Sequence, residues 1–331
     1  MTRTAARPTI TDVARAAGVS VSTVSRVING KGEVSRQAAD AVRRAMAEVG
    51  FTASPVARSL VGAQTRLIGL QARNLGDDYV STILRGVTRA AEDAGYGLLL
   101  FGGSADAGNP AADLVRTMPD GLLVISPVLD EEPAAASAGV MAANRAGAGE
   151  AVRALVALGH RRIAMIAGTP EFTSSRDRLA GYRDALAEAG IPWDDDLVAP
   201  GCNDRDSGLV AARRLLDLPD RPTAIFASND LEAVGALTAA RERAIPVPEA
   251  LSVIGFDDSP AALHTAPPLA TVHQPLAEMG RRAVAMLVDW IAGNPPAEPL
   301  LVLPTHLVMR ESAGPAPVHA GAADAPALRW Q

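Results

Sequence analysis

The apolar and polar positions of residues 9–29 predict two short helices joined by a tight turn. The apolar residues of the first helix recur at the spacing of a single helical face, and they are Ile10, Val13, Ala14 and Ala17. Thr9 is a typical N-cap residue, and Asp12 follows it at the spacing of a capping box. Gly18 stands where a helix commonly ends in a left-handed residue. Residues 10–17 are therefore predicted to form a short amphipathic helix.

The second predicted helix, which follows the N-cap Ser20, has two chemically different faces. Its inner face carries Val24, Val27 and Ile28. Its outer face carries Ser22, Ser25, Arg26 and Asn29. Short polar side chains and one arginine favour contact with a DNA major groove, and the alternative is an ordinary helical hairpin on a domain surface. Val21 has two interpretations, because its spacing would bury it, whereas its place at the helix start would let it lean toward a thymine methyl group.

Two further helices are predicted before residue 64. Ser35 is a suitable N-cap and Gly50 a suitable stop for the third helix, which completes a small three-helix core. Ser54 and Pro55 fit the start of a very short helix that ends at Gly62. Because helices this short are unstable alone, we expect it to order only when another surface packs on it.

From residue 66 onward, short apolar runs alternate with stretches of helical periodicity. The predicted strands are residues 67–70, 97–101, 121–125, 163–167, 224–227 and 251–256. The predicted helices are residues 80–94, 148–158, 176–189, 207–216 and 231–242. Such alternation is typical of doubly wound parallel α/β sheets, in which ligands bind at the carboxyl ends of the strands. The expected fold is thus a small all-α headpiece joined to an α/β core.

Charge is distributed unevenly along the chain. The net charge is −6, yet the first 64 residues hold nine basic side chains against four acidic ones. A basic head on an acidic body is expected of a DNA-binding module joined to a regulatory domain. Hydrophobic residues make up 48% of the chain but aromatic residues only 3%, so the core is expected to consist mainly of Ala, Val, Leu and Ile.

Composition argues against several other classes of protein. Cys202 is the single cysteine, so neither an intrachain disulfide nor a cysteine zinc site is expected. Charged residues or prolines interrupt the apolar stretches, and the first residues lack the apolar segment of a secretory signal, which favours the cytoplasm and no membrane. Residues 101–103 are no dinucleotide fingerprint, and no phosphate-loop lysine is present. His160 is expected to cap a helix C-terminus, so we expect neither an enzyme nor a cofactor.

The sequence motifs resemble those of one family when taken in order. Residues 8–35 read PTITDVARAAGVSVSTVSRVINGKGEVS and are followed by ARSL. Further along come ALGHRRIAMIAG, RPTAIFASNDLEAVGAL and VPEALSVIGFDDSP. These runs are similar to the headpiece, hinge and regulatory core of the LacI/GalR family of bacterial transcriptional repressors. The resemblance spans roughly residues 8–313, and the ordered series is more specific than any one motif.

The resemblance implies a division into domains. A helix-turn-helix headpiece would occupy residues 8–53, and a hinge helix with its linker residues 54–64. A two-lobed, periplasmic-binding-protein-like core would occupy residues 65–313, with lobe 1 at about 65–144 and 276–303 and lobe 2 at about 145–273 and 304–313. Residues 314–331 are rich in Pro, Ala and Gly, so that tail is expected to be disordered.

The resemblance also assigns residues that contact DNA. Positions that read bases match Val21, Ser22 and Arg26. Positions that touch phosphates or the helix start match Thr11, Ser20, Thr23, Ser25 and Asn29. Positions of the hinge helix match Val56, Ala57 and Leu60. Leu60 resembles an apolar wedge that unstacks a base step in the minor groove, and the alternative is a packing contact within a short linker helix.

Candidate effector-binding residues lie at the ends of predicted strands and in the first lobe. The resemblance assigns Arg178, in RLAGY, to effector hydroxyls or a carboxylate, groups that suit a guanidinium fork. The other candidates are Asp78, Tyr79, Asn229, Asp230, Asp257 and Gln274. Asn and Asp at such places are also ordinary helix caps. His273 is expected to be structural. The effector is expected to be a sugar or a sugar derivative.

The first lobe departs from the family pattern. Where the family usually has an Asn/Asp-Pro-Phe motif, Asp78 replaces the proline and Tyr79 the aromatic residue. Residues 126–144 are too few for the usual loop, and we expect only a short helix and a fragment of strand there. Ala143 stands where the family often has an aspartate. The alternative to effector control is therefore a regulator with a ligand-independent core.

The resemblance to the LacI/GalR family also implies binding partners. One headpiece makes few base contacts, so a homodimer on pseudo-palindromic double-stranded operator DNA is expected. Self-association is expected through helices at residues 82–94 and 276–291, and the tail has no heptads that would make a tetramer. The predicted function is a repressor of a catabolic or carbohydrate-related operon. A sugar-binding receptor is the other alternative, although it would carry a signal peptide and no basic headpiece.

Overall fold

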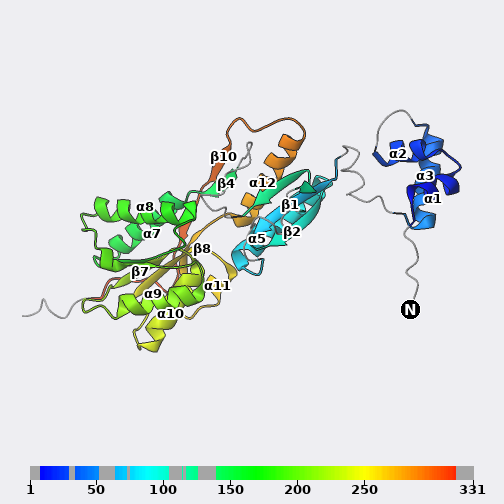
Figure 1. The fold of residues 1–331 in the computed structure, drawn as a ribbon. Helices are drawn as coiled ribbons and strands as arrows, with labels where there is room; N and C mark the ends of the chain where they lie inside the picture. The colour runs from blue at the N-terminus through cyan, green and yellow to red at the C-terminus, as the bar shows by residue number, and fades with distance from the viewer. Residues whose placement is uncertain are drawn as a thin grey trace, which may run out of the picture. The chain divides into compact units, whose positions relative to one another are not determined.

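Three helices form the N-terminal headpiece of the structure, a computed structural model that describes residues 8–29, 34–51, 64–72, 75–103, 114, 117–125 and 139–317. The helices are α1 (Ile10–Ala17), α2 (Val21–Asn29) and α3 (Arg36–Val49) (Figure 1). Their facing stripes bury Val13, Ala14, Val24, Val42 and Ala45. The predicted headpiece is therefore confirmed.

Local hydrogen bonds fix where these helices begin and end. The Asp12 carboxylate accepts hydrogen bonds from the backbone N–H of Thr9 at 2.9 Å and from its hydroxyl at 2.7 Å. Ser35 accepts from the N–H of Ala38 at 3.3 Å. Gly18 ends α1 with a φ of 66°, a conformation that glycine adopts without steric cost. The capping pattern read from the sequence is thus the one that the headpiece uses.

Three predicted features fall outside the described residues. They are the short hinge helix with Val56, Ala57 and Leu60, the segment 126–138, and residues 318–331 of the predicted tail. Residues 314–317 of that tail are instead held to the core, where the N–H of Gly314 donates to the Ser252 hydroxyl at 3.0 Å.

A three-stranded sheet with the order β2-β1-β3 follows the headpiece in sequence. Its strands are β1 (Leu67–Ala72), β2 (Gly97–Gly102) and β3 (Gly121–Val124). Asp120, just before β3, accepts from the N–H and the hydroxyl of Thr65 at 2.7 and 2.8 Å and from the N–H of Arg66 at 2.9 Å. One carboxylate therefore holds the start of β1 beside the start of β3.

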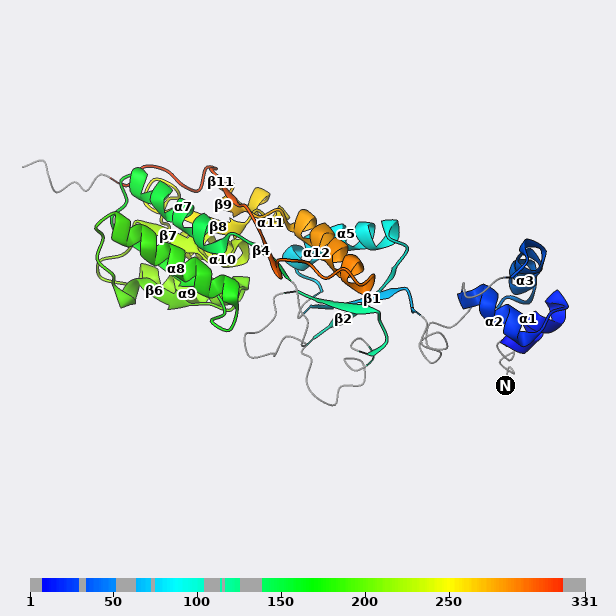
Figure 2. The same cartoon turned by 90° about the horizontal axis from the view of Figure 1, so that it is seen from above.

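Helices α5 (Asp78–Asp93) and α12 (Leu276–Ile291) pack against each other although they are far apart in sequence (Figure 2). Glycines make the approach close, because a Cβ at Gly86 would overlap the backbone of Ala277, and one at Gly280 would overlap that of Ile83. Beside α12, β4 (Gly139–Ala142) pairs in parallel with β10 (Leu300–Leu303). The fragment of strand expected before Ala143 is therefore a paired strand, with β10 as a partner that the sequence did not reveal.

A six-stranded sheet with the order β11-β9-β8-β7-β5-β6 forms the largest part of the core. Its strands are β5 (Ile163–Ala167), β6 (Val198–Pro200), β7 (Ala224–Ala227), β8 (Ser252–Asp257), β9 (Ala270–His273) and β11 (His306–Val308). All neighbouring strands run parallel except β11, which pairs antiparallel with β9. The predicted parallel sheet is confirmed.

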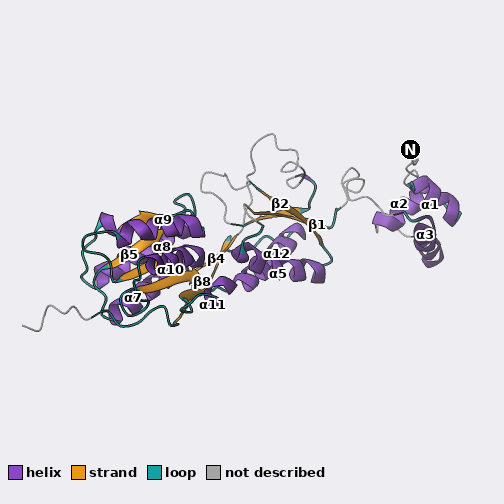
Figure 3. Cartoon of the chain, turned by 90° about the horizontal axis from the view of Figure 1, so that it is seen from below, coloured by secondary structure: helices purple, strands orange, loops and turns teal. Residues whose placement is uncertain are grey.

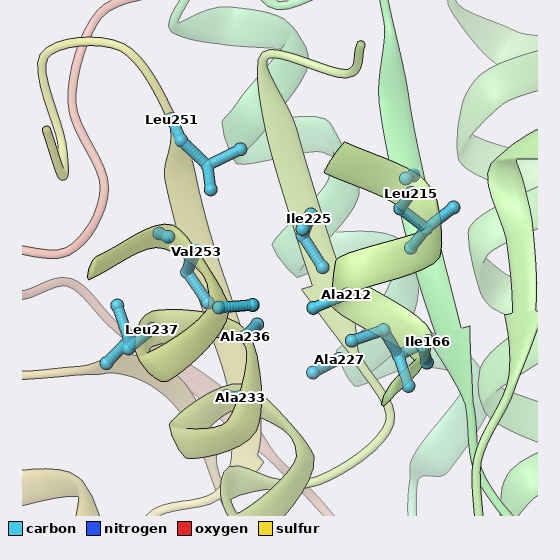
Figure 4. Packing of buried hydrophobic residues seen from close by; sticks show 14 of the residues in the cluster. Ile166, Ala212, Leu215, Ile225, Ala227, Ala233, Ala236, Leu237, Leu251 and Val253 are labelled. Carbon is cyan, nitrogen blue, oxygen red and sulfur yellow. The ribbon is translucent and has the colours of Figure 1, made fainter. Parts of the chain in front are cut away.

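Helices cover both faces of this sheet (Figures 1 and 3). The helices of one face are α7 (Asn144–Ala157) and α8 (Thr173–Glu188), and those of the other are α9 (Arg205–Leu216) and α10 (Asp230–Glu242). Successive residues of β5 alternate between two buried clusters, with Ile163 toward α7 and α8 and Ala164 toward α9 and α10. Figure 4 shows Ile166, Ile225 and Val253 packed against the α9 and α10 side chains.

Two short helical segments complete the fold, η1 (Asp195–Leu197) and α11 (Pro260–Leu263). None of the helices that the structure describes is both long and apolar enough to span a bilayer.

His160 has a different role from the helix cap expected for its side chain. Its buried imidazole lies 2.9 Å from the Thr223 hydroxyl, 3.0 Å from that of Ser252 and 3.1 Å from the carbonyl oxygen of Gly314. Only its backbone N–H caps α7, by donating to Leu155. Burial lowers the pKa of His160. The ring is therefore a neutral link between the starts of β7 and β8 and the returning C-terminal chain.

We expect Gly86→Ala to lower the free energy of unfolding by about 1–3 kcal/mol, because its Cβ would force apart two backbones rather than displace a side chain. Chemical denaturation of the full chain measures the change. Gly139→Ala is the control, since its Cβ would meet only the end of the Leu300 side chain, at 3.4 Å. Equal stability of the two variants would contradict the close packing of α5 and α12.

Candidate functional site

The outer face of α2 presents the predicted DNA-reading residues to solvent. The hydroxyl of Ser20 accepts from the N–H of Thr23 at 3.1 Å and lies 2.8 Å from the hydroxyls of Ser22 and Thr23, so these groups form one network at the helix start. Val21 is 43% exposed, which shows that the interpretation that buried it was wrong. Val24, fully buried, is the contact that sets the orientation of the helix.

Arg26 is the exposed guanidinium on this face, and it makes no ion pair with any residue that the structure describes. Arg15 and Arg43, by contrast, pair with Asp12 and Asp40 at 3.2 and 2.9 Å. A free guanidinium can donate two parallel hydrogen bonds to a guanine edge. The remaining predicted contacts differ in placement: Thr11 and Ser22 are exposed, Ser25 is half-buried, and Asn29 is the last residue of α2.

A second polar cluster surrounds Arg178 of α8, which is 5% exposed. Its Nε donates to Asn144 Oδ1 at 2.9 Å and its Nη1 to the carbonyl oxygen of Ser228 at 2.5 Å. Nη1 also lies 3.5 Å from Asp257 Oδ1, and the guanidinium is 3.8 Å from the centroid of the Phe256 ring. The arginine therefore joins the start of α7 to the carboxyl ends of β7 and β8.

Asp257 ends β8 in a strained conformation, with a φ of 122° that side chains other than glycine rarely adopt. Its buried carboxylate accepts from Gln274 Nε2 at 2.6 Å. Burial raises the pKa of Asp257 well above its usual range, Arg178 opposes that shift, and the charge of Asp77 adds to it. The structure thus brings three predicted site residues, Arg178, Asp257 and Gln274, into one cluster.

Asn229 and Asp230 have structural partners at the start of α10. The Asn229 side chain accepts from the N–H of Glu232 at 2.8 Å, which is an N-cap, and it donates to the carbonyl oxygen of Asn203 at 2.9 Å. The two oxygens of Asp230 accept from the Thr271 hydroxyl at 2.5 Å and the N–H of Ser259 at 2.7 Å. Burial raises the pKa of Asp230 to about 6. Both oxygens of Asp230 are thus engaged within the protein.

His273 contributes to a separate network at the end of β9. Its Nδ1 lies 2.9 Å from Asp258 Oδ2, and Arg310 donates to the other oxygen of that carboxylate at 2.5 Å. This arrangement agrees with the structural role expected for His273.

At the start of α5, the sequence prediction selected Asp78 and Tyr79, which are exposed and half-buried. The residue before them, Asp77, caps the helix by accepting from the N–H of Tyr79 at 2.9 Å. Burial raises the pKa of Asp77, and its charge reaches Asp257. Asp77 therefore fixes the start of the helix that carries the two predicted residues, although it was not itself predicted. The available signal was its place as the acidic residue of the family's Asn/Asp-Pro-Phe motif.

Four more polar residues that the sequence did not single out gather near Gly168, after β5. Gly168 is surrounded by Ser175, Asn203 and Ser228, and Glu232 adjoins them through Asn203. Glu232 is fully buried, and its Oε1 accepts from the N–H of Asn203 at 2.9 Å. Burial raises the pKa of Glu232 to about 7. No group of His, Cys, Asp and Glu side chains suited to a metal ion occurs within the described part of the chain.

Comparison with known proteins agrees with both halves of this architecture. Residues 9–54 match the family model of bacterial regulatory proteins of the lacI family, and residues 152–313 match that of a periplasmic binding protein-like domain. The HTH-type transcriptional regulator CelR of Thermobifida fusca is 36% identical over 334 residues, which cover 92% of this chain and 98% of that protein.

Two solved structures extend the similarity over nearly the whole fold. A transcriptional regulator CelR–cellobiose complex has a TM-score of 0.69 at 34% identity, covering 93% of this chain and 100% of that one. The lac repressor dimer bound to operator and the anti-inducer ONPF has a TM-score of 0.79 at 29% identity, covering 93% and 99%.

A helix-turn-helix headpiece followed by a periplasmic-binding-protein-like core defines a class of bacterial transcriptional regulator. The chain belongs to the lacI family of bacterial regulatory proteins.

We expect Glu232→Gln to stabilise the chain, and to do so more strongly at high pH. The carboxyl has a pKa near 4.5 when unfolded and about 7 when folded, so the stability it contributes is present below pH 4.5 and is lost as pH rises through 7. Glutamine mimics the protonated form. The gain in free energy of unfolding should approach about 3 kcal/mol at about pH 8 and be much smaller at about pH 5.

Glu242→Gln is the matched control on the same helix. The carboxylate of Glu242 is exposed, and its hydrogen bond from Arg213 lowers its pKa. Its neutralisation should give no gain in denaturation midpoint at high pH. A pH-independent effect of Glu232→Gln would contradict the burial of a titrating carboxyl at this position.

Proposed function

We propose that this chain is a sequence-specific DNA-binding repressor of a catabolic or carbohydrate-related operon, with operator affinity controlled by a small-molecule effector. The supporting observation is the exposed polar face of α2, with Arg26 free of ion pairs to the described residues, in the headpiece segment that matches the lacI family. A helix of this kind reads base edges in the major groove. Because it acts on chromosomal DNA, the protein would work in the bacterial cytoplasm.

Binding as a homodimer supports the required specificity. The lac repressor, whose fold this chain shares, is a dimer bound to operator. Two headpieces that read two half-sites of a pseudo-palindrome double the number of base contacts. Helices α5 and α12 are tightly packed within one chain, so a dimer contact through them would use the faces that each helix turns away from the other.

Effector control is supported by the buried cluster around Arg178 and Asp257. CelR of Thermobifida fusca is similar over both halves of the chain, and a solved CelR structure that this chain resembles is a complex with cellobiose. We infer a sugar or sugar derivative that contacts Arg178, Asp257 and Gln274, with Asp77, Asp78 and Tyr79 on the first-lobe side. Asn229 and Asp230 would act by positioning these groups. The ligand shifts the population toward the conformation to which it binds better, and operator affinity changes with it.

Arg26→Ala should weaken binding to the chain's own operator by about 1–3 kcal/mol, because a bidentate base contact is lost. The operator is first found by genomic footprinting, and affinity is then measured at fixed salt concentration. Arg44→Ala removes the same charge from an exposed position on α3 and is the control. If both variants lose equal affinity for operator and for random DNA, Arg26 reads no base.

Leu60→Ala should reduce the bending of bound operator DNA, since an apolar wedge that unstacks a base step is removed. Circular-permutation gel shifts or fluorescence energy transfer between DNA ends report the bend angle. An unchanged bend would assign Leu60 to packing within the linker instead.

A further inference from the structure

The chain that follows the headpiece enters the core at Thr65 and Arg66, directly before β1. One side chain holds both residues, because the carboxylate of Asp120 accepts three hydrogen bonds from them. Its Oδ1 accepts from the N–H and the hydroxyl of Thr65, and its Oδ2 accepts from the N–H of Arg66. The N–H of Asp120 donates to the carbonyl oxygen of Leu67 at 2.9 Å. Asp120 is therefore bonded to three successive residues at the entry to the core.

Arg66 has a backbone conformation that is unfavourable for a residue with a side chain. Its φ of 58° lies in the left-handed region, where a Cβ crowds the following carbonyl oxygen. Its own carbonyl oxygen accepts from the N–H of Gly97 at 2.8 Å, and its guanidinium lies 5.3 Å from the centroid of the buried Tyr96 ring. Such a conformation persists only where the surroundings over-determine it. The contacts with Asp120, Tyr96 and Gly97 together fix one chain direction at Arg66.

These bonds order residues that lie outside the strand. Thr65 is 5% exposed, and its hydroxyl oxygen also accepts from the N–H of Leu67 at 3.3 Å. Arg66 is exposed, so the burial of its side chain does not explain its fixed backbone. Because the headpiece precedes Thr65 in the chain, a restraint at this point is a restraint on the connection between headpiece and core.

We propose that Asp120 is a positioning residue for operator binding: by holding Thr65 and Arg66, it fixes the direction in which the chain leaves the core toward the headpiece, and so sets the half-site spacing that a dimer accepts. The inference rests on the proposed operator binding by a homodimer. Two headpieces can read two half-sites only when they lie a defined distance apart on the duplex. A connection that is directed before binding lowers the cost of ordering that geometry.

The simpler role for Asp120 is to stabilise the sheet by joining the start of β1 to the start of β3. The two roles predict different results. A purely stabilising carboxylate changes the free energy of unfolding and leaves the preferred half-site spacing as it was. A positioning carboxylate also sets that spacing, so its loss weakens binding at the native spacing and makes other spacings less unfavourable.

Operators of altered spacing test this role in the full-length chain. The native operator is found by genomic footprinting, and a base pair is inserted or deleted between its half-sites. The Kd for each operator and for random DNA is measured at fixed salt concentration. Wild type should lose affinity for both altered operators. Asp120→Ala should bind the native operator about tenfold or more weakly, with a smaller penalty for altered spacing. Its binding to random DNA should not change, because the basic side chains of the headpiece are intact.

Two milder variants keep the test valid if Asp120→Ala does not fold. Asp120→Asn keeps one acceptor oxygen but replaces the other by an NH2 group, so it cannot accept from both Thr65 and Arg66. Thr65→Val removes the hydroxyl and keeps the backbone bond. Both should reduce the spacing penalty in the same direction as Asp120→Ala, by a smaller factor.

Asp194→Ala is the matched control before β6 of the other sheet. The carboxylate of Asp194 likewise accepts from a backbone N–H, that of Asp196 at 3.0 Å, and it also accepts from Arg162 at 3.1 Å. Its removal should lower the denaturation midpoint and leave the spacing preference as in the wild type.

Two results would overturn the positioning role: a spacing penalty that is unchanged in all three variants of Asp120 and Thr65, or an equal reduction of that penalty in Asp194→Ala. If the wild type binds its native operator normally in either case, the proposed DNA-binding function stands and only the role of Asp120 is wrong. A wild type that binds the native operator no better than random DNA contradicts the proposed function itself.

Discussion

The buried guanidinium of Arg178 is the interaction on which the organisation of the core depends. A cation in this position is tolerated only if protein acceptors surround it. Asn144 supplies one from α7, Ser228 another from the end of β7, and Asp257 a third from the end of β8. The same requirement explains the strained backbone at Asp257, because a positive φ is retained where the surroundings over-determine it. Elements distant in sequence are thereby held at one edge of the sheet, which is where a parallel α/β sheet binds its ligand.

The headpiece is organised by a different constraint, the small size of its core. Five fully or nearly fully buried side chains join three helices, and Val24 is the one contributed by α2. Because the inner face of α2 is used for this packing, its polar residues necessarily face outward. Capping hydrogen bonds at Thr9 and Ser20 then fix the starts of α1 and α2, and Arg26 lies on the exposed face of α2. A basic face with a fixed helix orientation is what distinguishes a DNA reader from an ordinary helical hairpin.

Much of this fold could be predicted from the local spacing of apolar residues and from the residues that cap its helices. The six strands expected from apolar runs are present, and α12 covers the residues that were expected. The strands that escaped prediction, β6, β9, β10 and β11, are short, with three or four residues each. The site was only partly predictable. Arg178 and Asp257 lie in recognisable motifs, whereas Glu232 and Asn203 matter only because α10 meets the β6–α9 loop in space. His160 was misassigned for the same reason, since its partners come from Thr223, Ser252 and Gly314, far away in sequence.

The departures of the first lobe from its family pattern concern side chains more than architecture. Where Ala143 replaces an aspartate, β4 still forms and pairs with β10, so the backbone frame does not require that carboxylate. The core nevertheless contains other buried acidic groups, Asp257 beside Arg178 and Glu232 beside Asn203. A polyol can satisfy carboxylates on either side of it, since each hydroxyl both donates and accepts. The loss of one aspartate therefore leaves buried acids elsewhere in the core, so acceptors for hydroxyl groups remain although their positions differ.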